Sequence, residues 1–228
     1  MSDLRPELAA KAERVKAILF GLGKVAVSFS NGVDSTLLLR LAVDACGPEN
    51  VLALTGRSAS LPGRELEGAR ATAQSLGVRH LAVETGELDD PSFRANPPDR
   101  CYHCKKRRLR VLRRAAAERG FGWIVEGTNR DDLGDYRPGL RASEEEGTRS
   151  PLLEAGLGKK EIRELSRELG LAGWDRPAAA CLASRLPYGM EITVERLTQV
   201  ERAEEYLEGL GFSPVRVRHH GDVARLEV

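Results

Sequence analysis

The sequence predicts an α/β fold in which a Rossmann-like parallel sheet carries helices on both faces, followed by a small α+β appendage. Short apolar runs rich in β-branched residues alternate with segments of helical period, and this alternation stops near Ile192. The 228 residues suffice for one domain with a full core and a small addition. We therefore expect a main domain over residues 1–188 and a smaller substrate-binding or oligomerisation region over residues 189–228.

Four short apolar runs are predicted to be the strands of the parallel sheet. They are Lys24–Phe29, Val51–Thr55, His80–Glu84 and Trp123–Glu126. Apolar residues at helical spacing predict an amphipathic helix before the first strand and further helices between and after the strands. The further helices are Ser35–Ala45, Pro62–Leu76, Cys104–Arg119 and Glu161–Leu169, the last ended by Gly170 as a cap. Strands that alternate with helices in this way indicate parallel pairing.

The C-terminal part has a different pattern. From Ile192 a helix with apolar residues on one side leads into Pro214–His219 and Val223–Val228, two alternating stretches around the turn 220–222. The last stretch is still a strand where the sequence stops, and we expect further residues to follow it. One other segment, Arg141–Arg149, is polar enough to predict a mobile surface loop.

Composition favours a soluble, cytoplasmic protein. Hydrophobic residues make up 41% and charged residues 30%, and the N-terminus lacks the apolar core of a signal peptide. No apolar run approaches the ~20 residues that span a bilayer, so we expect no membrane contact. The net charge of +1 gives no overall attraction to nucleic acid, which makes tRNA an unfavoured partner.

A candidate phosphate-binding loop, Ser30–Ser35, lies between a predicted buried strand and a predicted helix. Backbone N–H groups at such a turn, together with the helix dipole and flanking hydroxyls, can hold phosphate oxygens. It is not a Walker A loop, because Gly21–Lys24 has neither the spacing nor the hydroxyl that this motif needs. The alternative is an ordinary strand-to-helix turn, which favours the same residue types.

Three of the four cysteines could share one centre. Cys101 and Cys104 form a C-x-x-C at the start of a helix, and Cys181 follows 77 positions after Cys104. Two nearby thiolates and a third from a distant loop can hold a metal centre with one open position. A zinc site with His103, His219 or His220 as fourth ligand and a dithiol redox pair are the alternatives. Cys46 ends an apolar helix and is predicted to be a buried small hydrophobe.

A run of basic residues, Lys105–Arg114, holds seven Lys and Arg residues in ten. On a helix, Leu109 and Leu112 would face inward and the charges would cover the rest. This pattern favours a solvated face, with RNA or a nucleotide phosphate as the alternative ligand of the helix.

The stretch VSFSNGVDSTLLL resembles the SGGxDS signature of the PP-loop ATP pyrophosphatases, which cleave ATP to AMP and pyrophosphate. Asn31 stands where that family has glycine. Asn tolerates left-handed backbone angles better than most residues, so we expect the turn to survive, although its Cβ would come close to the pyrophosphate.

Further motifs resemble one branch of this superfamily, the LarE family of sulfur transferases, over nearly the whole chain. They are Gly127–Asn129 with Asp131 and Asp132, Asp135–Gly139, Ser150–Leu152, Cys181–Arg185, Pro187–Gly189 and Arg216–Gly221. The resemblance implies that ATP adenylates a carboxylate of pyridinium-3,5-biscarboxylic acid mononucleotide, which then becomes a thiocarboxylate for the nickel-pincer cofactor used by lactate racemase. It also implies a homo-oligomer, with a hexamer as one form.

The resemblance implies a role for each matching residue. The catalytic residues would be Cys181, Lys105 and Asp34. ATP and Mg²⁺ would be held by Ser28, Ser30, Asn31, Gly32, Asp34, Ser35, Thr55, Gly127, Asn129 and Asp132. The nucleotide substrate would be held by Arg185, Glu204, Arg216 and Arg218, and a 4Fe-4S cluster by Cys101, Cys104 and Cys181. Family members with one cysteine sacrifice its sulfur instead, so a sacrificial Cys181 is the alternative to the cluster.

Three other functions remain open at this point. A PP-loop tRNA thiolase also combines C-x-x-C with a distant cysteine, and an ammonia-using ATP pyrophosphatase ligase would not need the thiols. A nucleotide-binding regulator without catalysis is suggested by Asn31 alone.

Overall fold

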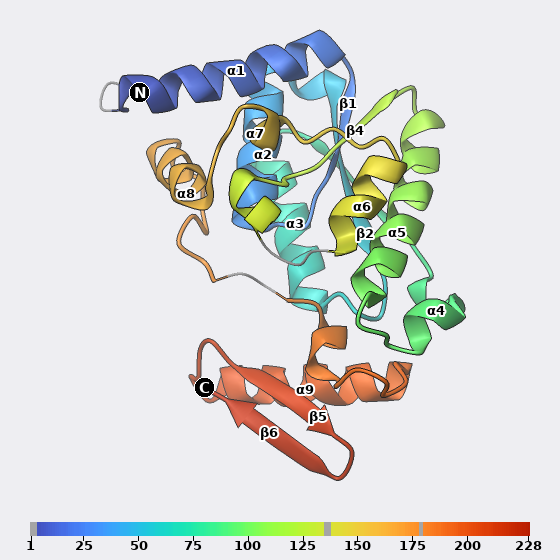
Figure 1. Ribbon diagram of the computed structural model, residues 1–228. Helices are drawn as coiled ribbons and strands as arrows, with labels where there is room; N and C mark the ends of the chain where they lie inside the picture. The colour runs from blue at the N-terminus through green and yellow to red at the C-terminus, as the bar shows by residue number, and fades with distance from the viewer. Residues whose placement is uncertain (1–3, 135–137, 178–179) are drawn as a thin grey trace.

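The computed structural model describes residues 4–134, 138–177 and 180–228. Four parallel strands form one sheet in the order β3-β2-β1-β4, and a separate antiparallel hairpin lies near the C-terminus (Figure 1). The strands of the sheet are β1 (Val25–Ser28), β2 (Val51–Arg57), β3 (Arg79–Glu84) and β4 (Trp123–Val125). The predicted α/β class, the parallel sheet and the small C-terminal α+β unit are confirmed.

Helices cover both faces of the sheet because successive strand side chains point to opposite sides. Val25 and Val27 of β1 belong to a core on one face, formed with α1 (Pro6–Leu22) and α2 (Val33–Cys46). Ala26 between them belongs to a second core on the other face. That second core includes Leu109 and Leu112 of α5 (Arg100–Ala117), as their predicted inward orientation requires. Strands buried on both faces explain the continuous apolar runs.

The remaining elements complete the main domain. Its other helices are α3 (Gly63–Ser75), α4 (Pro91–Arg94), α6 (Pro138–Glu145), α7 (Pro151–Glu154) and α8 (Lys159–Glu168). Short 3₁₀ turns are η1 (Pro48–Asn50), η2 (Glu87–Asp89), η3 (Arg130–Gly134) and η4 (Leu182–Arg185). Among these helices, α3, α7 and α8 contribute to the same core as α1 and α2.

The prediction of a mobile loop over Arg141–Arg149 is wrong. Helix α6 occupies the first half of this segment, and Ala142 is fully buried. The backbone of Arg149 then pairs alongside β4, accepting a hydrogen bond from the N–H of Glu126. The segment is ordered because its acidic residues bind basic residues of α5, for example Glu146 with Arg110.

The C-terminal unit consists of α9 (Val194–Gly209) and the hairpin of β5 (Arg216–His220) and β6 (Val223–Glu227). Figure 1 places it below the sheet domain, next to α4 and the start of α5. A hydrophobic cluster joins Phe93 of α4 to Leu182 and Leu186 on one side and to Leu197 of α9 on the other. The division of the chain at residue 188 stays a prediction.

None of the helices in the described part of the chain is both long enough and apolar enough to cross a membrane.

Candidate functional site

The predicted phosphate loop connects β1 to the N-terminus of α2. Ser35 lies in the first turn of α2, and its hydroxyl donates to the carbonyl of Gly32 at 3.0 Å and accepts from the N–H of Ser30 at 3.3 Å. The hydroxyls of Ser30 and Ser35 are also 3.3 Å apart. These contacts hold the loop open around the start of the helix, where the dipole and free N–H groups favour anions.

Asn31 has a left-handed backbone with φ of 59°, as expected for a residue in a glycine position. Its side chain is turned toward α3, where its carbonyl oxygen accepts from the hydroxyl of Thr72 at 2.8 Å. A Cβ on Gly68 of α3 would lie 2.5 Å from the Asn31 amide nitrogen, so α3 leaves room for this side chain. The extra atoms of asparagine are therefore held against the neighbouring helix by a hydrogen bond.

Asp34, the predicted Mg²⁺ ligand, is paired with a lysine that sequence analysis did not select. The Nζ of Lys159, at the start of α8, lies 2.5 Å from Asp34 Oδ2. The amide of Asn129 donates to Asp34 Oδ1 at 3.5 Å, and the carboxylate of Asp132 accepts from the N–H of Asn129 at 2.9 Å. The structure thus brings together Asp34 at the start of α2 with Asn129 and Asp132 from the segment after β4.

Lys105 enters the same site from α5. Its Nζ contacts both carboxylate oxygens of Glu126, at 3.0 and 2.9 Å, at the end of β4. Glu126 is buried and also accepts from the hydroxyl of Thr128 at 2.9 Å. A buried carboxylate with two partners fixes the ammonium group, so Lys105 projects from α5 with little freedom.

Two other predicted nucleotide ligands have structural reasons for their identity. A Cβ on Gly127 would lie 2.9 Å from the backbone nitrogen of Ser35, so β4 can approach the start of α2 only with glycine there. The hydroxyl of Thr55 is buried, donates to the carbonyl of Phe29 and lies 2.8 Å from His80 Nε2. Thr55 thereby fixes the end of β1 where the loop begins.

These residues line a cavity of about 270 Å³, which we call the loop cavity. It is lined by Ser28, Ser30, Gly32, Asp34, Ser35, Thr55, Gly127 and Asp132 among others. A second cavity of about 430 Å³, the thiol cavity, is lined by Cys101, Cys104 and Cys181. The two cavities share Gly56, Leu61, Lys105, Arg108, Thr128 and Asp132, so the loop and the thiols lie on either side of one boundary.

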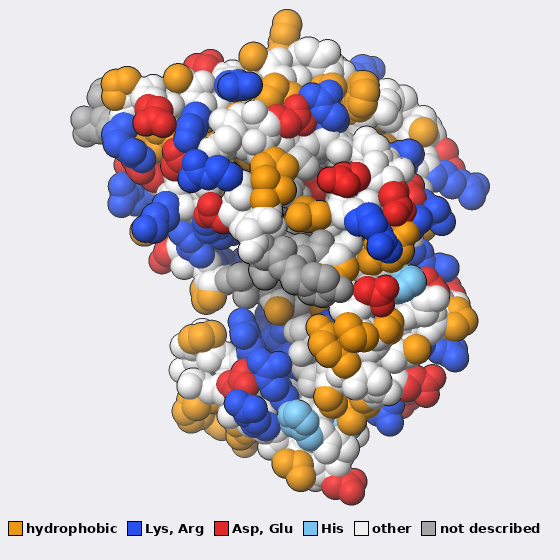
Figure 2. All heavy atoms as spheres, viewed as in Figure 1, with side chains coloured by type: hydrophobic (Ala, Val, Ile, Leu, Met, Phe, Trp, Pro, Cys, Tyr) orange, Lys and Arg blue, Asp and Glu red, His pale blue; other side chains and the backbone are white. Residues whose placement is uncertain are grey.

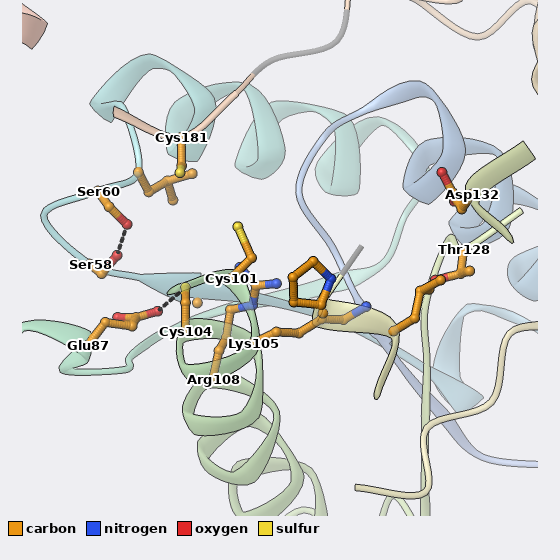
Figure 3. Close-up of a pocket in the computed structure, with 15 residues that line it drawn as sticks. Ser58, Ser60, Glu87, Cys101, Cys104, Lys105, Arg108, Thr128, Asp132 and Cys181 are labelled. Carbon is orange, nitrogen blue, oxygen red and sulfur yellow. Dashed lines mark hydrogen bonds between the residues drawn. The ribbon is translucent and has the colours of Figure 1, made fainter. Parts of the chain in front are cut away.

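Figure 3 shows that the thiols reach their cavity from opposite sides. Cys101 and Cys104 lie on the first turns of α5, while Cys181 comes from the segment just before η4 and faces them. Cys101 and Cys181 are exposed, and Cys104 is partly buried. Burial raises the pKa of the Cys104 thiol to about 12, and the nearby guanidinium of Arg108 opposes this shift. Cys104 is therefore protonated at neutral pH unless a metal displaces the proton.

A carboxylate lies beside this trio. Glu87 in η2 is buried, accepts from the hydroxyl of Thr85 at 2.7 Å and lies 4.0 Å from Cys104 Sγ. The fourth cysteine, Cys46, is predicted to be a buried small hydrophobe; it packs against the core around α2 but is only partly buried, and this burial raises its pKa.

The three thiols form a donor set of the kind that iron-sulfur clusters use, on one cavity and with no disulfide among them. Within the described residues, no group of three or more His, Cys, Asp or Glu side chains is positioned to hold a metal ion. His103 lies against Asp99 and Tyr102, and His219 against Gln199. The donor types therefore suit a cluster, but the structure does not bring the three thiols together as a metal site within the described residues.

A hydrogen-bond network fixes the two thiol-bearing segments relative to each other. Asn96, fully buried with φ of 53°, donates to the carbonyls of Pro187 and Met190 at 2.8 and 3.0 Å. The buried guanidinium of Arg100 donates to Asn96 Oδ1 at 2.6 Å and to the carbonyl of Ala183 at 2.9 Å. The residue before Cys101 is thus tied to the residues that follow Cys181.

The four predicted substrate-binding residues lie at the C-terminal unit, and none of them lines the loop or thiol cavity. Arg185 and Glu204 form a buried ion pair with contacts of 2.8 and 3.1 Å, and Glu204 also accepts from the N–H of Val217. Arg218 pairs with Glu227, while Arg216 is exposed. The buried pair joins η4 to α9 and β5, so it has a structural function. The substrate role of all four stays a prediction.

The basic run of α5 is only partly a solvated face. Lys105 and Arg108 turn toward the cavities, whereas other members of the run pair with carboxylates. These pairs are Lys106 with Glu145, Arg107 with Asp89, Arg110 with Glu146 and Arg114 with Glu118. Acidic and basic side chains also lie side by side on the upper part of the face in Figure 2. Much of the charge of the run is therefore neutralised by these pairs.

Sequence reasoning did not select Glu126, Lys159, Arg108 or Glu87. Glu126 ends the predicted fourth strand, where ligands of α/β sheets gather, so its position alone could have marked it. Lys159 lies 125 residues after Asp34, and only the fold brings the two together.

Comparison with known proteins agrees with this geometry. The pattern of the NAD synthase family matches residues 12–128. The chain is 46% identical over 221 residues to an uncharacterised protein of Synechocystis sp., covering 97% of this chain and 82% of that protein. It is 40% identical over 221 residues to pyridinium-3,5-bisthiocarboxylic acid mononucleotide synthase of Lactiplantibacillus plantarum, covering 97% of this chain and 80% of that enzyme.

The chain belongs to the LarE family of PP-loop ATP pyrophosphatases. A more distant relative is the NH₃-dependent NAD⁺ synthetase of Methanococcoides burtonii, 29% identical over 157 residues, which are 66% of this chain and 59% of that enzyme. Membership in the LarE family identifies the chain as an ATP-using enzyme, and the assignment of its phosphate loop to Ser30–Ser35 stays a prediction.

Proposed function

We propose that this enzyme adenylates a carboxylate of pyridinium-3,5-biscarboxylic acid mononucleotide and replaces the activated oxygen with sulfur. The observation that carries the proposal is the shared boundary of the loop cavity and the thiol cavity. A carboxylate activated over the loop would lie within reach of a sulfur source in the thiol cavity. The relative from Lactiplantibacillus plantarum, named for the bisthiocarboxylic product, supports this substrate.

The reaction has two steps. A carboxylate oxygen attacks the α-phosphorus of ATP, the bond to the bridging oxygen breaks, and pyrophosphate leaves with that electron pair into the loop Ser30–Ser35. A sulfur nucleophile then attacks the acyl carbon and AMP leaves, since phosphate esterification has made the oxygen a good leaving group. Lys105 and the N–H groups of the loop neutralise the developing phosphate charge.

Asp34 and Asp132 would hold Mg²⁺ against the phosphates, where the ion would neutralise charge. In the structure the ammonium group of Lys159 lies against the Asp34 carboxylate, so Mg²⁺ would have to displace that ammonium group. Cys101, Cys104 and Cys181 would hold a 4Fe-4S cluster, which would supply the sulfur at the oxidation level of sulfide. The remaining alternative is that Cys181 gives up its own sulfur.

The cluster is tested by analysing iron and acid-labile sulfide after anaerobic reconstitution of the parent, a Cys101→Ala variant and a Cys46→Ala control. The proposal expects about four irons per chain in the parent and the control, and their loss in Cys101→Ala. Iron-free parent protein that still makes one thiocarboxylate per chain would establish sacrificial Cys181 instead. Zinc in place of iron would overturn the cluster.

An ammonia-using ligase is a second candidate, because the NAD synthase pattern matches half of the chain. Such an enzyme would form an amide with ammonium chloride, and Cys181→Ala would keep full activity. Sulfide-dependent product that disappears in Cys181→Ala would exclude it. The neutralised surface of α5 supports a small substrate over tRNA, and a salt-sensitive tRNA gel shift would reverse that choice.

We also propose a cytoplasmic homo-oligomer, with a hexamer as the form to test. Light scattering of the purified protein gives its mass directly.

A further inference from the structure

Arg108 lies at the boundary between the loop cavity and the thiol cavity, and it lines both. It also lines a third cavity of about 530 Å³ that contains Asn31, Asp34 and Cys181. In Figure 3 its side chain extends from α5 beside Cys101 and Lys105. Only Leu61 and Asp132 share this position on all three cavities.

The other cations of these cavities are already paired. Lys105 contacts Glu126, Lys159 contacts Asp34, and Arg176 contacts Glu65. Within residues 4–134, 138–177 and 180–228, the guanidinium of Arg108 has no hydrogen bond or ion pair. It is partly buried, so a full hydration shell does not replace the missing partner. A partly desolvated arginine of this kind suits an anionic ligand.

Strand β2 leaves room for the aliphatic part of the Arg108 side chain. A Cβ on Gly56 of β2 would lie 2.8 Å from Cδ and 2.9 Å from Cγ of Arg108. The backbone of Gly56 is not left-handed, so the glycine is required by this close approach and not by its own conformation. Gly56 therefore sets where the guanidinium lies.

The chemistry of the two cavities indicates which anion belongs here. In the proposed reaction pyrophosphate would lie at the N-terminus of α2, in the loop cavity, and the acyl carbon would have to meet sulfur in the thiol cavity. The α-phosphate is bonded to both groups in turn, so it must lie at the boundary that the two cavities share. Among the residues that the structure describes, Arg108 is the unpaired cation at that boundary.

We propose that Arg108 binds the α-phosphate of ATP and keeps it through the acyl adenylate to AMP. Its N–H groups donate to the two non-bridging oxygens while the bond to pyrophosphate breaks, and the guanidinium stays protonated throughout. The assignment of the acyl adenylate rests on the proposed function, whereas binding of an α-phosphate requires only that the enzyme uses ATP.

The test compares the binding of AMP with that of pyrophosphate, by calorimetry, in the parent, Arg108→Ala and Gly56→Ala. AMP carries the α-phosphate alone, and neither ligand needs a sulfur source or the carboxylate substrate. We expect AMP to bind ~10- to 100-fold more weakly to Arg108→Ala, with pyrophosphate changed less than ~3-fold. Gly56→Ala should weaken AMP binding in the parent and have little further effect in the Arg108→Ala background.

Arg114→Ala is the control, since Arg114 lies on the same helix, is 85% exposed at its side chain and pairs with Glu118. If Arg108→Ala weakened the binding of AMP and of pyrophosphate equally, the proposal would be overturned, because Arg108 would then act on the phosphates held by the loop. Unchanged AMP binding in Arg108→Ala would also overturn it. Sulfur transfer by the parent is scored separately, so failure of the proposed function would leave these binding results intact.

Discussion

The phosphate loop and the thiol cavity differ in what fixes them. The loop is held by contacts among neighbours in the chain, such as Ser30 with Ser35 and Ser35 with Gly32. The thiols are placed by segments about 80 residues apart in sequence, joined through Asn96 and Arg100. The internal hydrogen bonds of the loop are therefore local, whereas the positions of the thiols depend on how the segment 180–190 packs against Asn96 and Arg100.

The largest effect is expected at Cys181, where a substitution should separate sulfur transfer from the use of ATP. Cys181→Ala should abolish formation of thiocarboxylate product, because it removes the thiol that faces Cys101 and Cys104 across the cavity. ATP binding and pyrophosphate release should stay within ~2-fold of the parent, since Cys181 contributes no contact to the loop. Mass spectrometry measures the thiocarboxylate product, and a pyrophosphate assay measures the release of pyrophosphate. Loss of both activities would show that sulfur transfer and the use of ATP are not separable.

The second-largest effect is expected at the buried ion pair of Arg185 and Glu204, which joins η4 to the C-terminal unit. Glu204→Ala leaves the buried guanidinium of Arg185 and the N–H of Val217 without their acceptor. Removing one partner of a buried pair should lower the free energy of unfolding by about 3–5 kcal/mol. Urea denaturation measures this, and the double variant Arg185→Met with Glu204→Met should recover much of the loss. An exposed-pair control, Glu118→Ala, should change it by less than ~1 kcal/mol.

A smaller effect tests how tightly the loop is fixed. Gly127→Ala places a Cβ 2.9 Å from the Ser35 nitrogen and 3.0 Å from the Asp34 carbonyl carbon, so the start of α2 must shift. We expect ATP affinity to fall by ~10- to 100-fold, since displacements near 1 Å carry costs of this size. Calorimetric titration with ATP checks it. Gly122→Ala, where a Cβ meets nothing within 4 Å, is the control and should bind ATP like the parent.

The smallest effect is predicted at Asn31. Asn31→Gly relieves the cost of a left-handed backbone but removes the hydrogen bond from Thr72, two changes of about 1 kcal/mol with opposite sign. The equilibrium constant of unfolding and the dissociation constant of ATP should therefore each stay within ~3-fold of the parent value. Thr72→Val, which only removes the hydrogen bond, should be the less stable of the two in thermal melts. A large gain of ATP affinity in Asn31→Gly would show that asparagine does crowd the phosphate.

Features fixed by neighbouring residues could be predicted from the sequence. The strands of the sheet follow their apolar runs, and the left-handed Asn31 follows from its glycine position. The loop itself needed no tertiary information, because strand, turn and helix are consecutive. The spacing of the cysteines indicates a shared centre without any family resemblance; all three thiols line one cavity, and their role as cluster ligands stays a prediction.

Features that depend on distant partners could not be predicted. The polar pattern around α6 wrongly predicts a loop, because Glu145 at its end and Glu146 just after it find their cations in α5, about 40 residues earlier. Helix α5 begins at Arg100 and not at Cys104, since the charge of Arg100 is buried against Asn96 and Ala183. Arg108 has the same sequence signal as its solvated neighbours, and only the glycine in β2 distinguishes it.

The buried Asn96 has a consequence for how a metallocentre could be assembled. Its hydrogen bonds to Pro187 and Met190, with those of Arg100, set the gap between the thiol-bearing segments through protein contacts alone. Zinc fingers, in contrast, acquire their fold from the metal. Because the contacts of Asn96 and Arg100 are made by protein groups, we expect the loss of the proposed cluster to leave the fold intact, so that a cluster could be rebuilt on the same folded polypeptide.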